Sequence, residues 1–148
     1  MTRDDWTVRR DASARPEDSY ALCAETPPPQ LITGIWQFNR REFFACHETL
    51  ERLWLAECAP VRDLYQGILQ IGVAFYHLLR GNYRGAHVSL RRGITRLRPL
   101  PPVCRGVQVA RLVEDAEAAH AALVARGAAG LARFDLELIP TIDIAPSA

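Results

Sequence analysis

A histidine and two glutamates within one short stretch could bind a metal ion. The stretch FNRREFFACHETLERLW, residues 38–54, contains His47, Glu48 and Glu51. On a helix, His47 and Glu51 lie one turn apart, so both could bind one divalent metal ion, with His77 as a third ligand from another helix. Glu48 would then be the general base of a metal-dependent hydrolase, activating a metal-bound water. The match to the zinc-protease pattern H-E-x-x-H is incomplete, because Glu51 stands at the last position.

The same residues could instead belong to a polar seam between two helices. Gln66, Gln70 and His77 follow at helical spacing within an otherwise apolar segment, so they share one face. Buried polar groups need hydrogen-bond partners, and these side chains, with Arg62, could supply them to His47 and Glu51. Such a seam either fixes the packing of the two helices or lines a pocket, and the sequence leaves both alternatives open. The full predicted set is His47, Glu48, Glu51, Trp54, Arg62, Gln66, Gln70, His77 and Asn82.

A third candidate is a basic surface for anions. No aspartate or glutamate occurs from Leu64 to Val113, whereas arginines are frequent there and the chain has no lysine. Four of these arginines lie outside the predicted buried face of one helix and could bind phosphate, a nucleic acid or an acidic partner: Arg84, Arg91, Arg92 and Arg96. The simpler interpretation is that this basic helix packs beside acidic ones.

The elements that must position these residues are all helical. Apolar residues recur at helical spacing over about 30–37, 39–58, 61–80, 83–98 and 107–126, and no strand pattern competes with them. Asn39 is predicted to cap the second helix. The tail from Phe134 to Pro140 is predicted to pack back as an extended segment. The pattern predicts an all-α, mostly antiparallel bundle of about five helices over residues 29–148, after a flexible arm of residues 1–28.

Composition restricts the protein classes that fit this chain. With 148 residues and 49% hydrophobic residues, the chain can form one domain with its own core. It contains no apolar run long enough to span a membrane and no apolar segment typical of a signal peptide, so a cytoplasmic location is predicted. None of the cysteines, Cys23, Cys46, Cys58 and Cys104, shows C-x-x-C spacing, so all are predicted to be reduced thiols. A homodimer could form through exposed apolar faces of the first or last helix.

Two stretches together resemble a known family. FNRREFFACHETLERLW and, eight residues later, RDLYQGILQIGVAFYHLLRGNYRGA are similar to the pattern of domain-of-unknown-function family 309, with the best agreement over about 34–98. The resemblance implies a small all-helical fold and no particular reaction. The leading hypothesis is therefore a non-catalytic domain that binds a small ligand or a partner protein through the polar seam.

Overall fold

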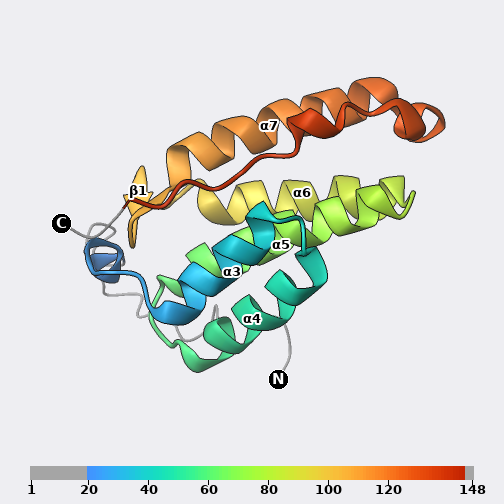
Figure 1. Ribbon diagram of the computed structural model, residues 1–148. Coiled ribbons are helices and arrows are strands. Elements are labelled where there is room, and N and C mark those ends of the chain that lie inside the picture. Colours follow the sequence, from blue (N-terminus) through green and yellow to red (C-terminus); the bar gives the residue numbers. More distant parts are fainter. Residues whose placement is uncertain (1–19, 146–148) are drawn as a thin grey trace.

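The structure is a bundle of helices, which confirms the predicted fold class. The computed structural model describes residues 20–145. Five α-helices follow one another in this range: α3 (Pro29–Asn39), α4 (Phe43–Ala56), α5 (Arg62–Leu79), α6 (Tyr83–Leu97) and α7 (Val109–Arg126). Helix α5 packs against both α4 and α6, and α7 packs against α6 (Figure 1). No helix among the described residues is long and apolar enough to cross a membrane.

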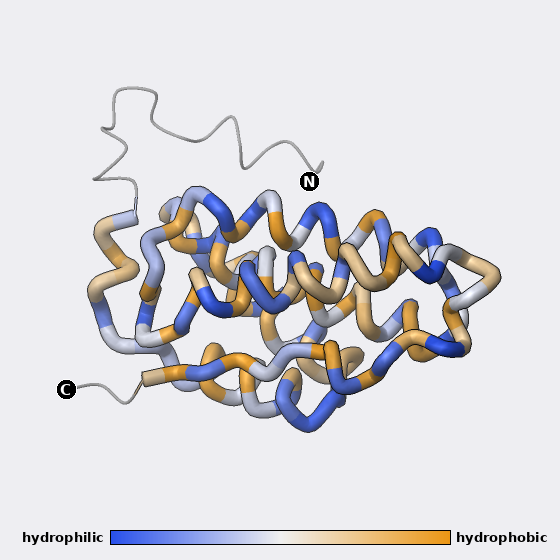
Figure 2. Tube along the Cα trace, turned by 90° about the horizontal axis from the view of Figure 1, so that it is seen from above, coloured by the Kyte–Doolittle hydropathy of each residue, from blue (hydrophilic) through white to orange (hydrophobic). Residues whose placement is uncertain are grey.

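Helix α5 owes its central place to one continuous apolar face. Leu64, Ile68, Ile71 and Phe75 recur at helical spacing, and all four are 0% exposed. Full burial of one such side chain stabilises the fold by about 1.5–3 kcal/mol. Hydrophilic and hydrophobic residues alternate along the other helices too, as amphipathic helices require (Figure 2). The sequence predicts a helix that is apolar almost all round and therefore central, with Gln66, Gln70 and His77 as the polar exceptions. This prediction is confirmed, because every residue from Arg62 to Leu78 is buried or partly buried.

The backbones of α5 and α6 come into direct contact at two glycines. A Cβ atom added to Gly93 would lie 3.0 Å from the carbonyl oxygen of Gly67, and one added to Gly67 would lie 2.4 Å from a methyl carbon of Leu97. Because a glycine inside a helix costs about 1 kcal/mol of helix propensity, Gly67 and Gly72 of α5 predict close approach of neighbouring backbones. That prediction is confirmed for Gly67, whereas a Cβ at Gly72 would only make ordinary contacts, the nearest at 3.6 Å from the Phe38 ring.

The α3–α4 and α5–α6 connections are two copies of the same turn. Arg40 (φ −87°, ψ 3°) and Arg80 (φ −98°, ψ 8°) end their helices in almost the same conformation. The residue that follows each has positive φ, 62° in the first turn and 78° in the second. In both turns the guanidinium lies over the aromatic ring four residues earlier, at 5.0 Å from Trp36 and 5.2 Å from Tyr76. Residues 29–97 therefore form two similar helical hairpins, α3–α4 and α5–α6.

Asn39 does not cap α4, so that prediction is wrong. It is the last residue of α3, and the turn occupies residues 40–42 before α4 begins at Phe43. The Asn39 amide instead pairs with the backbone of Ile142, donating to its carbonyl oxygen at 3.0 Å and accepting from its N–H at 2.7 Å. The side chain therefore fixes the C-terminal segment to the end of α3.

A short hairpin precedes α7, although no strand was predicted. Strands β1 (Val103–Cys104) and β2 (Val107–Gln108) pair antiparallel around Arg105 and Gly106, which both have positive φ. The predicted helix from 107 therefore begins two residues later, because these residues pair as a strand.

The chain after α7 returns along the bundle toward the hairpin (Figure 1). It contains the 3₁₀ helices η2 (Ala128–Arg133) and η3 (Leu136–Leu138), and Ile144 forms an isolated bridge with Val107. The tail was predicted to be extended from Phe134 to Pro140. It does pack back, with Phe134 and Ile139 buried, but η3 interrupts the extended backbone.

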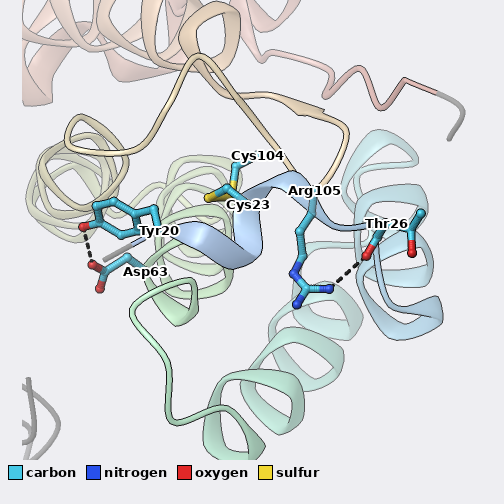
Figure 3. The surroundings of a disulfide bond; sticks show 6 residues. All are labelled: Tyr20, Cys23, Thr26, Asp63, Cys104 and Arg105. Atoms are coloured by element: carbon cyan, nitrogen blue, oxygen red, sulfur yellow. Dashed lines mark hydrogen bonds between the residues drawn. A yellow bond between two sulfur atoms is a disulfide. The ribbon is translucent and has the colours of Figure 1, made fainter. Parts of the chain in front are cut away.

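Two of the four cysteines are joined, so the prediction of reduced thiols is wrong for them. Cys23, in the 3₁₀ helix η1 (Ala21–Ala24), forms a disulfide with Cys104 of β1 across a sequence separation of 81 residues (Figure 3). Cys46 and Cys58 are free. Burial raises the pKa of the Cys46 thiol to about 12, so it is an inert core residue.

The segment around η1 is also held by Arg105. The backbone N–H of Arg105 donates to the carbonyl of Cys23 at 2.6 Å, and its guanidinium donates to the carbonyl of Thr26 at 2.9 Å (Figure 3). Residues 1–19 of the predicted arm lie outside the described residues. Disulfides are typical of oxidising compartments. The Cys23–Cys104 bond therefore removes the predicted reduced thiols as an argument for a cytoplasmic location, which stays a prediction.

Candidate functional site

The polar face of α5 forms a strip between α4 and α6. Arg62, Gln66, Gln70 and His77 share this face at helical spacing, and all except Arg62 are partly exposed. The Arg62 side chain is 4% exposed and its guanidinium lies 4.4 Å from the centre of the Trp54 ring. Cation–π contact of this kind partly replaces the hydration that the buried guanidinium loses. Arg62 was predicted as a hydrogen-bond partner of His47 and Glu51, and the structure places it instead against Trp54, another member of the predicted set.

Both glutamines of this strip hold a buried amide oxygen. The Oε1 atoms of Gln66 and Gln70 have no hydrogen-bond partner among the described residues. A buried acceptor without a partner costs about 1–3 kcal/mol. Because both oxygens are enclosed, they add to the cost of packing α5 and are not accessible to a molecule bound at the surface.

His47 and Glu51 interact with one another at the surface of α4. Their Nδ1 and Oε2 atoms are 3.7 Å apart, and their side chains are 35% and 47% exposed. His47 was predicted to face inward, but the buried face of α4 is formed by Phe43, Cys46 and Leu50. Glu48 is exposed. The predicted polar contact of this pair with the glutamines of α5 therefore has no hydrogen bond to support it in the described part of the chain.

A three-ligand metal site is not assembled around His47. Within residues 20–145, no group of three or more histidine, cysteine, aspartate or glutamate side chains lies close enough to hold a metal ion. His77 therefore does not complete a set with His47 and Glu51 in this arrangement. Binding of a divalent metal by that pair alone stays a prediction.

His77 and Asn82 build the α5–α6 turn. The Asn82 Oδ1 atom accepts from the Gly85 N–H at 2.9 Å and so caps α6, while its Nδ2 atom lies 3.4 Å from Nδ1 of His77. A Cβ atom at Gly85 would lie 2.7 Å from the His77 ring. Packing and helix capping therefore account for His77, Asn82 and Gly85 without a bound ligand.

A cleft of about 570 Å³ lies between α5 and α6. Its volume is in the range of small-ligand sites, about 300–1,000 Å³. It brings together Gln70 from the predicted seam and three of the predicted anion-binding arginines. The described residues that line it are Asp63, Gln70, Val88, Arg91, Arg92, Thr95, Arg96 and Pro99. Two sites predicted separately from the sequence thus meet in one place, whereas Arg84 lies elsewhere on α6.

Asp63 is the acidic member of the cleft and is 1% exposed. Its Oδ1 atom lies 3.6 Å from the guanidinium of Arg96, and its Oδ2 atom accepts from the hydroxyl of Tyr20 at 3.0 Å (Figure 3). Both contacts hold the carboxylate in place. Asp63 was not among the predicted site residues, although it is the last acidic residue before the stretch from Leu64 to Val113 that contains none.

A second depression lies on the other side of α6, toward α7. Its described lining consists of Arg91, Ile94, Thr95, Arg98, Glu117 and His120, so Arg91 and Thr95 border both hollows. Glu117 already neutralises Arg98, with oxygen and nitrogen atoms 2.8 Å apart. This ion pair makes the depression less basic than its two arginines alone would.

His120 connects α7 to α6 through His87. The Nε2 atom of His120 lies 2.9 Å from Nδ1 of His87, and the His87 ring stacks on Tyr83. A hydrogen bond between two imidazoles requires at least one of these nitrogens to be unprotonated. Burial, then the His87 and Arg91 charges, lowers the pKa of His120 below its ordinary value of 6.5.

Acidification should therefore weaken the fold. The unfolded chain binds a proton at His120 more readily than the folded chain, so stability is complete above about pH 6.5 and falls as the pH drops toward the lowered pKa. We expect the urea midpoint to decrease between about pH 7.5 and pH 5.5, and the decrease to be smaller in His120→Gln. His47→Gln is the matched control on another helix and should keep the wild-type decrease. Equal pH dependence in wild type and His120→Gln would contradict this assignment.

Part of the chain is similar to known proteins. Residues 31–88 match the model of the family described as domain of unknown function (DUF309). A stretch of 61 residues is 38% identical to "Uncharacterized protein YpuF" of Bacillus subtilis (strain 168). The match covers 40% of this chain and 35% of that protein, so the chain spans about a third of the relative's length. No solved structure matches the chain. The matched range contains the polar strip of α5 but ends before Arg91.

Proposed function

From the match of residues 31–88 to domain-of-unknown-function family 309 and the cleft that adjoins this range, we propose that the chain is a binding domain for a small anionic ligand. The site is the cleft between α5 and α6. The observation that carries the proposal is the presence of three guanidinium groups of α6, those of Arg91, Arg92 and Arg96, in the lining of one cleft.

The charge of the cleft favours an anion. Arg91 and Arg92 are exposed at its rim, and Arg96 is 24% exposed beside Asp63. Arginine presents several N–H donors in a planar arrangement that matches carboxylate and phosphate oxygens. One hydrogen bond to a charged group contributes about 1.5–3 kcal/mol, which corresponds to roughly tenfold or more in affinity.

The lining supports binding rather than catalysis. No histidine or cysteine is among the described residues that line the cleft. Its carboxylate, Asp63, already interacts with Tyr20 and Arg96. Thr95, Val88 and Pro99 add one hydroxyl and apolar surface, which suits a ligand that is only partly charged.

Calorimetric titration with glycerol 3-phosphate and with citrate tests the proposal. We expect at least one of these anions to bind, and Arg91→Ala or Arg92→Ala to weaken its binding by about tenfold or more. Arg84→Ala is the matched control, because Arg84 is an exposed arginine of the same helix that does not line the cleft. Equal affinity in all variants, or no binding of either anion at millimolar concentration, would refute the proposal.

A titration of the same variants with a single-stranded oligonucleotide tests the alternative of a nucleic-acid adaptor. A surface that follows a phosphate backbone uses every arginine along the helix, and its affinity decreases steeply with salt. If a single-stranded oligonucleotide binds and Arg84→Ala weakens it as much as Arg91→Ala, the basic face of α6 is an extended surface and not a cleft for a small ligand.

A further inference from the structure

We infer that His87 and His120 form a binding site for one divalent transition-metal ion that prefers tetragonal coordination, such as Ni²⁺ or Cu²⁺. The site lies between α6 and α7, where imidazole nitrogens from the two helices face one another. Neither histidine is among the described residues that line the α5–α6 cleft, so this site is independent of the proposed function.

The spacing of the two facing nitrogens matches that of neighbouring ligands on such an ion. Nε2 of His120 and Nδ1 of His87 are 2.9 Å apart. A histidine nitrogen lies about 2.0–2.1 Å from a bound ion such as zinc, and an ion at that distance from both nitrogens makes an angle of about 90° with them. This is the angle between neighbouring ligands in the tetragonal complexes of Cu²⁺ and Ni²⁺. A tetrahedral ion such as Zn²⁺ requires the nitrogens to separate to about 3.3 Å.

Both rings are held in place without an ion. The His87 ring stacks on the ring of Tyr83, with centroids 5.9 Å apart and planes 11° apart. The His120 ring is nearly parallel to the His87 ring, with an angle of 10° between their planes and centroids 4.8 Å apart. Because the two helices already bring both nitrogens together, metal binding requires little further ordering of side chains.

The hydrogen bond between the rings does not prevent metal binding. In this bond one facing nitrogen carries a proton and the other has a free lone pair, whereas an ion needs a lone pair on both. Each neutral imidazole has a second nitrogen, Nε2 in His87 and Nδ1 in His120, that can carry its proton instead. Both side chains are partly exposed, so water can exchange this proton. Two neutral rings therefore bind an ion without a net release of protons.

The surroundings of the pair set the expected strength of binding. His120 lines the second depression, of about 330 Å³, so an ion can reach it from solvent. No third histidine, cysteine, aspartate or glutamate of residues 20–145 completes a group around the pair, so water fills the remaining coordination positions. Arg91 borders the same depression, and its charge opposes a cation. We therefore expect an affinity in the micromolar range and not that of a closed structural metal site.

Calorimetric titration of the full chain with nickel chloride at about pH 7.5 tests the inference. We expect one Ni²⁺ ion per chain, and His87→Gln and His120→Gln should each weaken its binding by about tenfold or more, because one imidazole ligand is then missing. Mg²⁺ should not bind, because it prefers oxygen ligands. Since the ion joins two helices of the folded chain, Ni²⁺ should also raise the unfolding temperature of the wild type more than that of either variant.

His47→Gln is the matched control, because it removes the histidine of the other pair, His47 and Glu51. This variant should keep the wild-type affinity for Ni²⁺. A second measurement needs no substitution: paramagnetic Ni²⁺ should broaden the imidazole proton signals of His87 and His120 in the wild type before those of His47.

Three results would overturn the inference. The first is no uptake of Ni²⁺ at millimolar concentration, and the second is equal affinity in the wild type and in folded His87→Gln and His120→Gln. The third is loss of binding in His47→Gln with broadening of the His47 signals first, which would place the ion on α4. In each case the contact between His87 and His120 would be only a hydrogen bond that holds α7 to α6.

Discussion

Removal of the Cys23–Cys104 disulfide should lower the free energy of unfolding by about 2–4 kcal/mol. The bond joins η1 to β1 across 81 residues, so it strongly restricts the unfolded chain. Such a loss is a large part of the total stability of about 5–15 kcal/mol that is usual for a domain. Urea unfolding of the double variant Cys23→Ala/Cys104→Ala, followed by circular dichroism, measures the difference.

A matched pair of cysteines separates this effect from a general effect of thiol removal. Cys46→Ala and Cys58→Ala remove free thiols, and the exposed Cys58 variant should be close to neutral. Reducing agent should destabilise the wild type by the same amount as the double substitution and leave the double variant unchanged. If reducing agent has no effect on wild-type stability, the disulfide contributes nothing to the fold.

Gly93→Ala should destabilise the protein by about 1–3 kcal/mol, although alanine is the better helix former by about 1 kcal/mol. The added methyl group would lie 2.6 Å from a side-chain carbon of Ile71, and 3.0 Å from both the Gly67 carbonyl and the Ile71 amide nitrogen. A side chain can rotate away, but the α5 backbone cannot move without disturbing the core. Helices α5 and α6 must therefore separate, which also alters the cleft between them.

Gly72→Ala is the control for this prediction. Gly72 is also a buried helical glycine, but its nearest neighbours would be ring carbons at 3.6 Å. This variant should be neutral or more stable by up to about 1 kcal/mol, because it gains helix propensity without a clash. Thermal unfolding compares the stabilities of the two variants. If both variants change the unfolding temperature equally, the close approach at Gly93 does not contribute to stability.

The helices could be predicted because local sequence determines them. The buried stripe of α5, from Leu64 to Phe75, is visible as a helical period, and Gly67 marks the close approach of α6. The features that were missed depend on distant residues. Asn39 was expected to cap a helix beside it, yet its partner is Ile142. Cys23 and Cys104 carry no spacing signal, because a disulfide depends on proximity in the fold and not in the chain.

In the candidate site, too, local features could be predicted and features that depend on distant residues could not. The residues of α5 and the arginines of α6 were identified from the sequence, but each set was assigned to a separate role. Only the packing of the two helices places Gln70 beside Arg91 and Arg92. Asp63 could not be selected from the sequence, because an acidic residue in the first turn of a helix is common for electrostatic reasons alone.

The long-range closure by Asn39 and the C-terminal tail also has a consequence for how the chain folds during synthesis. The hairpins α3–α4 and α5–α6 make contacts between neighbouring segments, so they can form while the ribosome is still adding residues. The contacts of Asn39 with Ile142 and of Val107 with Ile144 need residues that are synthesised well after these hairpins, 103 residues after Asn39 in the first case. Contacts between such distant residues are slow to form. A nascent chain arrested before Ile142 should therefore hold helical hairpins whose end remains open, and synthesis beyond Ile144 should close it.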